Sequence, residues 1–490
     1  MLKRLAPLLL ISLLAACATP FENPPLNPGE ANADRRTIDL SDPDRPVVLV
    51  ALSGGGARAT ALGATILREL RSYTYAARGG QRRLVDDVAI VSSVSGGSVT
   101  AAYFGVFGPD QLDQLRPDFL DHDNMKALEL EAINPANWWR FTFEPYTRID
   151  VLRDMFDQQL FHGRTFAAIN QPDKPLVILN ATDMAAGETF AFTPSRFSDI
   201  CSDFDRTLLS VGVVSSAAFP IALTPMNFQN HSVERCRDVK MPQWIERSLS
   251  SRSEPYLDIE AFKRARYAND LRRGPNAFRD VRYLHFLDGG LADNLGLRSL
   301  KAAILSPHFT DCSDQDPKAE RWRTGCLLFA INSGKIRKLV VVTVNARSDP
   351  PNPLDTDPGR PGELAQISAV TSVPIDSTSA NMYAEMQSIL DEIKTAAKSA
   401  PVDARFGGMK VYSVLVDFDQ LRATDPAQRA LRDKAKAIPT SWTITAENME
   451  IVDQAGALLL KQHPCFQKLL LDLKAPAPVA DANFATSACR

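Results

Sequence analysis

The sequence has no excess of basic residues, no metal-binding cysteine pattern and no phosphate-binding P-loop. Its 490 residues include 55 Lys and Arg against 58 Asp and Glu, which gives a net charge of −3. A dedicated nucleic-acid binder needs a basic excess to neutralise phosphates, so no nucleic-acid partner is expected. No CxxC pair or Cys/His cluster has zinc spacing, and no Gly-x-x-x-x-Gly-Lys-Ser/Thr motif occurs. Neither a metal nor another cofactor is therefore expected.

The first residues of the chain have the layout of a targeting segment. Lys3 and Arg4 precede an uncharged apolar stretch, residues 5–18, whose fourteen residues are too few to span a bilayer comfortably. The stretch contains the sequence LAAC ending at Cys17, which resembles the bacterial lipoprotein signal. That resemblance implies cleavage of residues 1–16 and lipidation of Cys17. A plain secretory signal, with Cys17 present by chance, is the alternative.

A lipidated Cys17 would place the protein in a bacterial cell envelope. Ala18 rather than an aspartate follows this cysteine, which favours the outer membrane with the protein facing the periplasm. Residues 17–44 are then expected to form a lipidated tether, flexible over residues 20–32, where Pro and Asn are frequent.

Six further cysteines remain once Cys17 is set aside, and the periplasm is an oxidising compartment. Sequence order suggests three local disulfides, although six cysteines allow 15 connectivities. The suggested pairs are Cys201 with Cys236, Cys312 with Cys326, and Cys465 with Cys489.

Apolar runs alternate with helical stretches along the chain. Continuous β-branched and apolar residues predict buried parallel strands at residues 46–52, 85–91, 176–180 and 339–344. This order predicts an α/β fold with a mostly parallel central sheet flanked by helices. The Trp138-Trp139 pair is expected to pack in the core, with contact to membrane or acyl chains as the alternative.

The strongest chemical signal is Ser95 in the sequence VSSVSGGS, between an expected strand and an expected helix. A strained strand-to-helix turn presents a nucleophilic serine above an α/β sheet. Gly97 lies two residues after Ser95, as a Gly-x-Ser-x-Gly elbow requires, whereas Ser93 replaces the first glycine. An ordinary Ser/Gly turn is the alternative.

Two glycine-containing motifs accompany this serine. Gly54, Gly55 and Gly56 follow the first buried strand, where exposed N–H groups can stabilise an anion or an oxyanion. The same loop matches a relaxed dinucleotide-binding pattern, but the next strand ends without an acidic residue to hold a ribose. Asp288 follows an apolar segment and directly precedes two glycines. It is a candidate general base for the serine, and a simple Asp-Gly turn is the alternative.

Together these motifs resemble those of the patatin-like phospholipase family. The resemblance implies a Ser95–Asp288 catalytic dyad without histidine, an oxyanion hole built from Gly54, Gly55, Gly56 and Gly96, and no cofactor. The loop sequence SGGGAR is closer to the cytosolic phospholipase A2 type, in which the arginine helps hold phosphate, so Arg58 is a candidate headgroup contact. A helix-start arginine paired with a surface carboxylate is the alternative for Arg58.

The resemblance also implies a domain plan and an activity. It places a catalytic domain at residues 45–345, with insertions near 108–170 and 226–282, the first a possible cap over the site. A helical or loop extension, residues 346–490, would pack against it. The expected activity is hydrolysis of fatty-acyl esters of phospholipids or other acyl-lipids through an acyl-enzyme. Acyl transfer or thioester hydrolysis at the same site, and a non-catalytic lipid-binding envelope protein, remain alternatives.

Overall fold

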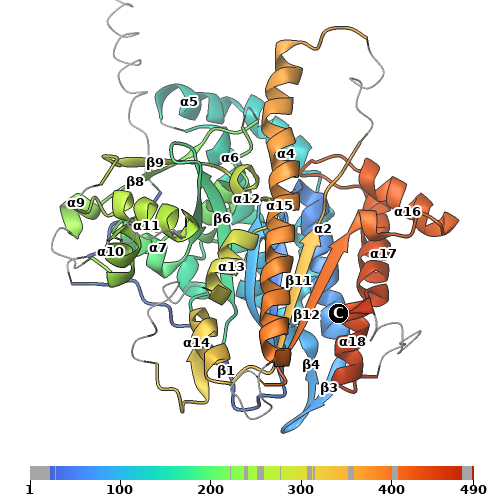
Figure 1. Cartoon of the computed structure of the whole chain (residues 1–490). Coiled ribbons are helices and arrows are strands. Elements are labelled where there is room, and N and C mark those ends of the chain that lie inside the picture. Colours follow the sequence, from blue (N-terminus) through green and yellow to red (C-terminus); the bar gives the residue numbers. More distant parts are fainter. Residues whose placement is uncertain are drawn as a thin grey trace, which may run out of the picture.

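The apolar runs of the sequence form the central sheet of the protein. A computed structural model describes residues 22–27, 29–144, 146–220, 222–236, 241–250, 259–275, 277–305, 312, 315–350, 358–399, 407–476 and 488–489. The predicted signal peptide and Cys17 lie outside the described residues. Helices cover the sheet on both sides (Figure 1).

The main sheet has eight strands in the order β12-β11-β2-β5-β6-β9-β8, and β7 pairs with β6. Strands β12, β11, β2, β5 and β6 are parallel, while β7 and β9 run antiparallel to β6. The predicted mostly parallel sheet is therefore confirmed. The strands are β2 (Pro46–Leu52), β5 (Val88–Val94), β6 (Leu176–Asp183), β7 (Glu188–Phe192), β8 (Met226–Gln229), β9 (Tyr283–Asp288), β11 (Lys338–Asn345) and β12 (Lys410–Asp417).

Both faces of the sheet are buried, which explains why its strands are continuously apolar. Along β2, Val48, Val50 and Leu52 belong to one hydrophobic cluster, while Val47 and Leu49 belong to the other. One cluster contains residues of α2 (Gly56–Ser72), α3 (Gly96–Phe107), α6 (Arg148–Phe156), α8 (Leu209–Ser216), α17 (Ala446–Gln462) and α18 (Pro464–Asp472). The other contains residues of α13 (Leu297–Leu305), α14 (Leu327–Asn332) and α15 (Glu363–Ser399).

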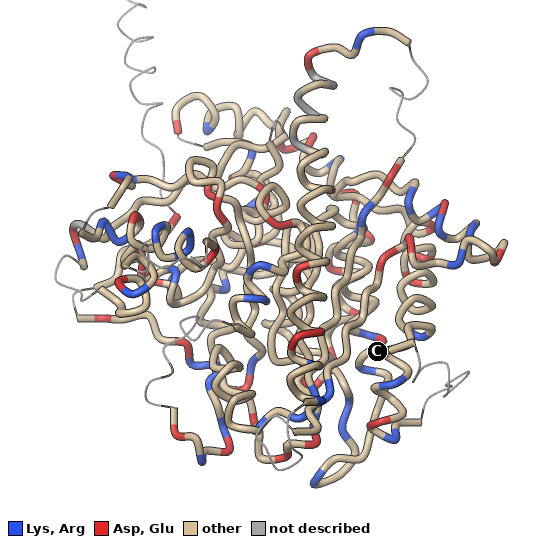
Figure 2. The backbone as a smooth tube through the Cα atoms, in the orientation of Figure 1, with Lys and Arg blue, Asp and Glu red and all other residues tan. Residues whose placement is uncertain are grey.

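The described residues also form two strand pairs outside the main sheet and further helices. They are the strand pairs β1 (Thr37–Asp39) with β10 (Arg321–Arg323) and β3 (Thr74–Ala77) with β4 (Gly80–Arg83), and the helices α4 (Asn124–Ile133), α5 (Pro135–Phe143), α7 (Pro194–Asp199), α9 (Ser232–Arg235), α10 (Gln243–Ser250), α11 (Ile259–Leu271), α12 (Gly290–Asp293) and α16 (Pro426–Ala437). Charged residues of both signs are interspersed over the described chain (Figure 2).

The C-terminal part is more than the helical or loop extension, packed on the catalytic domain, that the sequence predicted. It supplies β12, which pairs in parallel with β11 from Lys338 opposite Lys410 to Asn345 opposite Asp417. Helices α17 and α18 complete the core on one face of the sheet. The sheet therefore extends beyond the predicted boundary at residue 345. The pairing covers the edge of β11 and buries Val411, Val414 and Val416 of β12.

The predicted flexible tether is also wrong for the residues that the structure describes. Asn23 is buried, and its side chain exchanges hydrogen bonds with the Gln229 main chain, at 2.7 Å and 2.9 Å. The Leu26 N–H donates to the Cys201 carbonyl at 2.9 Å, and β1 pairs with β10. Residues 22–27 and 29–44 thus belong to the folded body.

The two predicted insertions are largely helical. The first contains α4, α5 and α6. The second, predicted over residues 226–282, begins with β8, which is a strand of the main sheet and not part of an insertion, and its helices α9, α10 and α11 lie between β8 and β9. The expectation that the tryptophan pair packs in the core is wrong, because Trp138 is 59% exposed and Trp139 is 61% exposed. Both rings lie on α5, outside the hydrophobic clusters.

The three suggested disulfides are present. They join Cys201 to Cys236, Cys312 to Cys326, and Cys465 to Cys489. Within the described part of the chain, no helix combines the length and the apolar character that crossing a bilayer would require.

Candidate active site

Strand β6 brings the predicted nucleophile and the predicted base together. Its residues 179–180 pair with β5 on one edge and with β7 on the other. Its residues 181–183 pair with β7 and with β9, so β9 occupies the same edge as β5. Val94 lies opposite Asn180, and Asp288 lies opposite the next residue, Ala181. The end of β9 therefore meets the end of β5, where Ser95 begins the turn into α3.

Ser95 has the backbone conformation expected of a nucleophile elbow. Its φ is 50° and its ψ is −122°, a combination that L-residues rarely adopt. Such strain costs about 1–3 kcal/mol and must be held by the surrounding structure. Gly96 and Gly97 make the turn possible, because a Cβ on Gly96 would lie 2.0 Å from the Gly56 oxygen, and one on Gly97 would lie 2.7 Å from the Ser53 oxygen.

Asp288 is a buried carboxylate in contact with Ser95. Its side chain accepts a hydrogen bond from the Ser95 hydroxyl and another from the Gly290 N–H, at 2.8 Å. Burial raises the pKa of Asp288 to about 6, although both hydrogen bonds lower it in part. The carboxylate is thus ionised at neutral pH yet more basic than an exposed aspartate, as a general base requires.

The main chain around Asp288 is equally fixed. Its N–H donates to the Ala218 carbonyl at 2.9 Å, and its carbonyl accepts from the Thr182 hydroxyl at 2.9 Å. Gly289 is required by close approach, since a Cβ there would lie 2.1 Å from the Asn180 oxygen. The aspartate–glycine pair is therefore part of a packed site rather than a simple surface turn.

Ser216 holds the elbow to β6, and sequence analysis did not assign it a role. Its hydroxyl accepts the Ser95 N–H at 2.9 Å and donates to the Asn180 carbonyl at 2.6 Å. Ser98 also lies 2.9 Å from Ser216, and its hydroxyl is 3.1 Å from that of Ser93. Ser93, the departure from the elbow pattern, is thus accommodated as a member of this hydroxyl network.

The glycine loop lies directly against the elbow. The ideal Cβ position of Gly54 is 3.3 Å from the Ser95 Cβ, and Gly55 and Gly56 have φ of 134° and 59°. The Gly54 N–H donates to the Asn294 carbonyl at 3.1 Å. Gly54 is therefore engaged in holding the loop, and its predicted part in an oxyanion hole would require this bond to break.

Arg58 is not placed as a headgroup contact, the role that the resemblance implied. It is buried, with its Nε donating to the Ala346 carbonyl at 2.8 Å, one Nη to the Ile438 carbonyl and the other to Thr440 Oγ1 at 3.2 Å. Burial lowers the pKa of Arg58 to about 10. In this structure the Arg58 guanidinium binds the C-terminal part of the chain to the glycine loop. Contact with a headgroup would require these hydrogen bonds to break.

The segment that Arg58 holds, residues 438–445, connects α16 to α17, and we refer to it as the strap. The Ala57 N–H donates to the Ser441 carbonyl at 2.7 Å, and a Cβ on Gly56 would lie 2.3 Å from the same oxygen. Ser95 is 7% exposed and Asp288 is 5% exposed. Sequence analysis missed the strap, since no motif marks its contact with a loop almost four hundred residues earlier.

Among the described residues, no group of three or more His, Cys, Asp or Glu side chains could hold a metal ion. The site itself brings together a serine, an aspartate and main-chain amides. Such a set is typical of acyl transfer from esters.

Similar solved structures include human GIVD cytosolic phospholipase A2, with 12% sequence identity, a TM-score of 0.39 and coverage of 88% of this chain and 62% of that chain. Another is the same human enzyme in complex with methyl gamma-linolenyl fluorophosphonate inhibitor and terbium chloride, with 11% identity, a TM-score of 0.36 and coverage of 88% and 59%. The chain thus spans about 60% of the length of these structures.

No curated protein matches the sequence significantly. The family model described as patatin-like phospholipase matches residues 50–301, just over half of the chain. The match begins in β2 and includes the glycine loop, the elbow and the Asp288-Gly289 pair. The chain therefore belongs to the patatin-like phospholipase family.

Proposed function

We propose that this protein is a serine lipid acyl hydrolase that cleaves fatty-acyl esters of phospholipids or related lipids. The observation that carries the proposal is the hydrogen bond from the strained Ser95 to the buried Asp288. A serine needs an adjacent base to become nucleophilic, and Asp288 has the position and the raised pKa for that task.

The proposed reaction has two steps. Asp288 takes the Ser95 proton while Oγ attacks the acyl carbonyl, and the proton then passes to the departing alcohol as the ester C–O bond breaks. Water next attacks the acyl-enzyme, with Asp288 accepting its proton and returning it to Ser95 Oγ as the fatty acid leaves. Asp288 acts as base and then as acid in each step, so protons balance.

The oxyanion of each tetrahedral intermediate would be stabilised by main-chain amides at this site. Gly55, Gly56 and Gly96 are our candidates, because Gly55 is the N-cap of α2 and the other two are the first residues of α2 and α3. The N-terminal amides of a helix lack intrahelical partners and carry partial positive charge. The Ser95 N–H is already bonded to Ser216 and is excluded from this role.

We further propose that the protein works at a membrane of the bacterial envelope. Cleavage before Cys17 and lipidation of that residue would anchor it, with the outer membrane as the expected site. Acyl chains insert with about 0.8 kcal/mol of favourable free energy for each buried CH₂ group. The three disulfides are compatible with this oxidising location.

The decisive experiment incubates the purified protein with mixed phospholipids and identifies products by mass spectrometry. Free fatty acid is expected from the parent and from a Ser72→Ala control, whose hydroxyl is on the surface of α2, but not from Ser95→Ala. Labelling of Ser95 by a fluorophosphonate probe is expected in parallel. Full activity in folded Ser95→Ala protein would refute the mechanism, whereas acyl transfer to another lipid would identify a transferase.

A further inference from the structure

The helical hairpin formed by α4 and α5, residues 124–143, is unusually apolar on its exposed side. Fifteen large hydrophobic side chains of the described residues are exposed, and six of these belong to this hairpin. They are Met125, Leu130, Ile133, Trp138, Trp139 and Phe143. Because soluble proteins rarely cluster large apolar side chains on the surface without a function, this side of the hairpin calls for an occupant.

The chemistry of the hairpin is suited to the boundary between water and lipid. The Trp138 Nε1–H donates to the Ala132 carbonyl at 3.0 Å, so the polar atom of the ring has a partner within the hairpin. Trp139 and Phe143 pack together, with ring centroids 4.1 Å apart. Tryptophan and other large apolar side chains are enriched where proteins meet the membrane interface.

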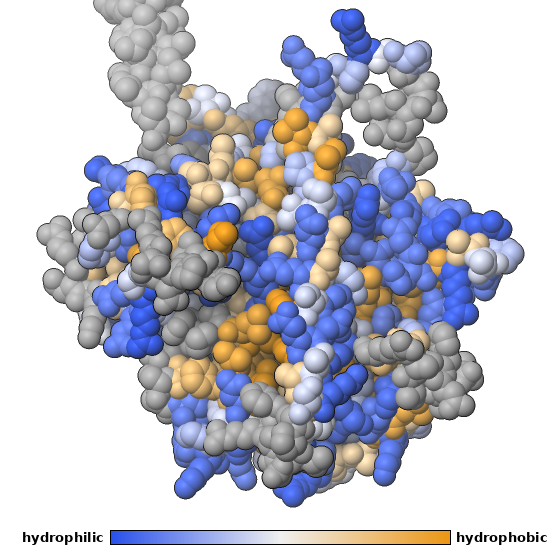
Figure 3. Space-filling view, viewed as in Figure 1, coloured by the Kyte–Doolittle hydropathy of each residue, from blue (hydrophilic) through white to orange (hydrophobic). Residues whose placement is uncertain are grey.

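The hairpin lies at the end of the sheet that carries the active site. Ser95 follows the carboxyl end of β5, and the parallel strands β11 and β12 point toward the top of Figure 1, where α4, α5 and the first turns of α15 are found. Val370 and Val373 of α15 are 73% and 64% exposed at this end. Hydrophobic side chains accordingly gather over the upper part of α15 in Figure 3.

The N-terminal residues approach the same part of the molecule. Glu22 forms an ion pair with Arg153 of α6, and the neighbouring Asp154 binds Tyr146 at 2.9 Å and Arg140 of α5 at 3.5 Å. Cys17 precedes Glu22 by five residues. Five extended residues span at most about 18 Å. A lipid on Cys17 would therefore lie within about 18 Å of Glu22, on the same part of the molecule as the hairpin.

We propose that the exposed side of the α4–α5 hairpin is a membrane-docking surface that inserts into a phospholipid bilayer beside the active site. The proposal rests on the lipid hydrolase function proposed above. Exposed charges on the hairpin have both signs, with Lys126 beside Glu129 and Glu131, so attachment is apolar rather than electrostatic. Binding should therefore persist in high salt, which screens surface charges.

The strap also connects the hairpin to the glycine loop. Asn124 Nδ2 donates to the Trp442 carbonyl at 3.1 Å, and the Met125 N–H donates to Thr443 Oγ1 at 2.9 Å. Ser441, which precedes Trp442 in the strap, accepts the Ala57 N–H through its carbonyl oxygen. The hairpin that contacts the bilayer would thus be hydrogen-bonded to the strap, and the strap in turn packs on Gly56 of the glycine loop.

The test uses the full chain with Ser95→Ala, so that vesicles are not digested, and bilayers of phosphatidylethanolamine and phosphatidylglycerol with brominated acyl chains. Tryptophan fluorescence is expected to be quenched by the bromines. Trp138→Phe/Trp139→Phe should remove most of the quenching, since the nearest reporters are gone. Quenching unchanged in this double variant would overturn the proposal, whether or not the protein hydrolyses lipids.

A second measurement uses the active enzyme and compares vesicle phospholipid with a soluble short-chain ester. Trp138→Ser/Trp139→Ser should lower vesicle hydrolysis by about tenfold or more and leave ester hydrolysis unchanged, because the lost apolar contacts belong to docking. The Phe pair should restore most of the vesicle activity. The control outside the hairpin is Phe329→Ser, which changes a side chain of α14 that is 40% exposed. Equal vesicle activity in the Ser pair, or its conversion of a dimer into a monomer, would assign the surface to another partner.

Discussion

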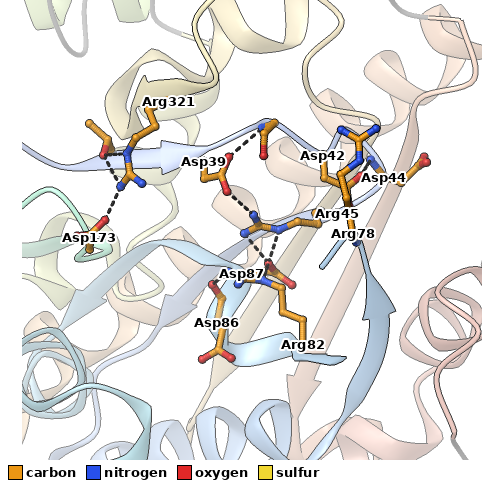
Figure 4. Close-up of polar contacts among 12 residues, drawn as sticks. Asp39, Asp42, Asp44, Arg45, Arg78, Arg82, Asp86, Asp87, Asp173 and Arg321 are labelled. Atoms are coloured by element: carbon orange, nitrogen blue, oxygen red, sulfur yellow. Dashed lines mark hydrogen bonds and ion pairs between the residues drawn. The ribbon is translucent and has the colours of Figure 1, made fainter. Parts of the chain in front are cut away.

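Strand β5 has Asp87 immediately before its first residue and Ser95 immediately after its last. Each end of the strand thus has a buried aspartate, Asp87 at the amino end and Asp288 beside Ser95 at the carboxyl end, and the two carboxylates differ in the charge of their hydrogen-bond partners. Asp87 accepts hydrogen bonds from Arg45 at 3.1 Å and 3.2 Å, from Arg82 at 2.6 Å and from the Tyr75 hydroxyl at 2.5 Å. Figure 4 shows the two arginines converging on this carboxylate. At the other end, Asp288 is buried with one neutral hydroxyl and one amide as partners.

The comparison shows how one strand can serve stability and chemistry separately. Arg45, Arg82 and Tyr75 all donate to Asp87 at the amino end, so that end is suited to holding the sheet together. The carboxyl end keeps a strained serine and a carboxylate without a cation, which is costly for folding but necessary for a base with a raised pKa. Active sites commonly concentrate such unfavourable features.

Substitution of either member of the dyad at the carboxyl end of β5 should reduce hydrolysis more than any other change proposed here. Asp288→Asn and Ser95→Ala should each lower ester hydrolysis by about a thousandfold or more, because either change removes the base–nucleophile pair. Thermal unfolding should be unchanged or shifted slightly upward, since Asp288→Asn relieves the burial of a carboxylate. Product release and melting temperature measured on the same samples would check this, and a large loss of stability would contradict the separation of roles.

The converse change breaks the amino end. Asp87→Ala should destabilise the protein by about 3 kcal/mol, because Arg45 and Arg82 lose their shared partner in a partly buried site. Activity per folded molecule should stay close to that of the parent. Denaturant unfolding would measure the loss, with Asp173→Asn as a control, because that exposed ion pair to Arg321 should contribute less than about 1 kcal/mol.

A substitution at Gly96 tests how tightly the two glycine segments are packed. Gly96→Ala would place a Cβ 2.0 Å from the Gly56 oxygen, so the elbow and the loop must separate. We expect kcat to fall by about a hundredfold, in the range observed when an oxyanion donor is removed. Steady-state kinetics would show it, and Gly362→Ala, which has open space around it, should behave as the parent.

The pH dependence of hydrolysis should follow the ionisation of Asp288. The pKa of Asp288 is raised to about 6, and only its ionised form can accept the Ser95 proton. Since protonation increases as pH falls, kcat/KM should decline below about pH 6, approaching tenfold per pH unit, and should be level above it. A profile that stays flat down to pH 4, with the protein folded, would be inconsistent with Asp288 as the base.

Local sequence was sufficient for the parts of the site that depend on local geometry. The elbow, the glycine loop and Asp288 each sit in a short strand-to-turn segment, and such turns require particular residues at fixed offsets. The parallel strands were also predictable, because burial on both faces makes each of them continuously apolar, as in β2 and β11.

Other features depend on contacts that no local pattern records. Strand β12 alternates in burial at its end and gains its place only by pairing with β11. Arg58 was expected at a ligand because its neighbours resemble a family motif, but its partners lie 288 and more residues away. The Trp138-Trp139 pair looked like core by composition alone, while exposure is decided by which neighbours remain to cover it.

The pairing of both catalytic strands with β6 has a consequence for how this chain can change in evolution. The position of Asp288 is set by its pairing with Ala181, not by the length of the chain that leads to it. The helices between β8 and β9 can therefore lengthen or shorten without moving the carboxylate. A single residue added within β9 would instead turn alternate side chains to the opposite face. Gene variants should accordingly accumulate insertions before Tyr283 and none between Phe286 and Asp288.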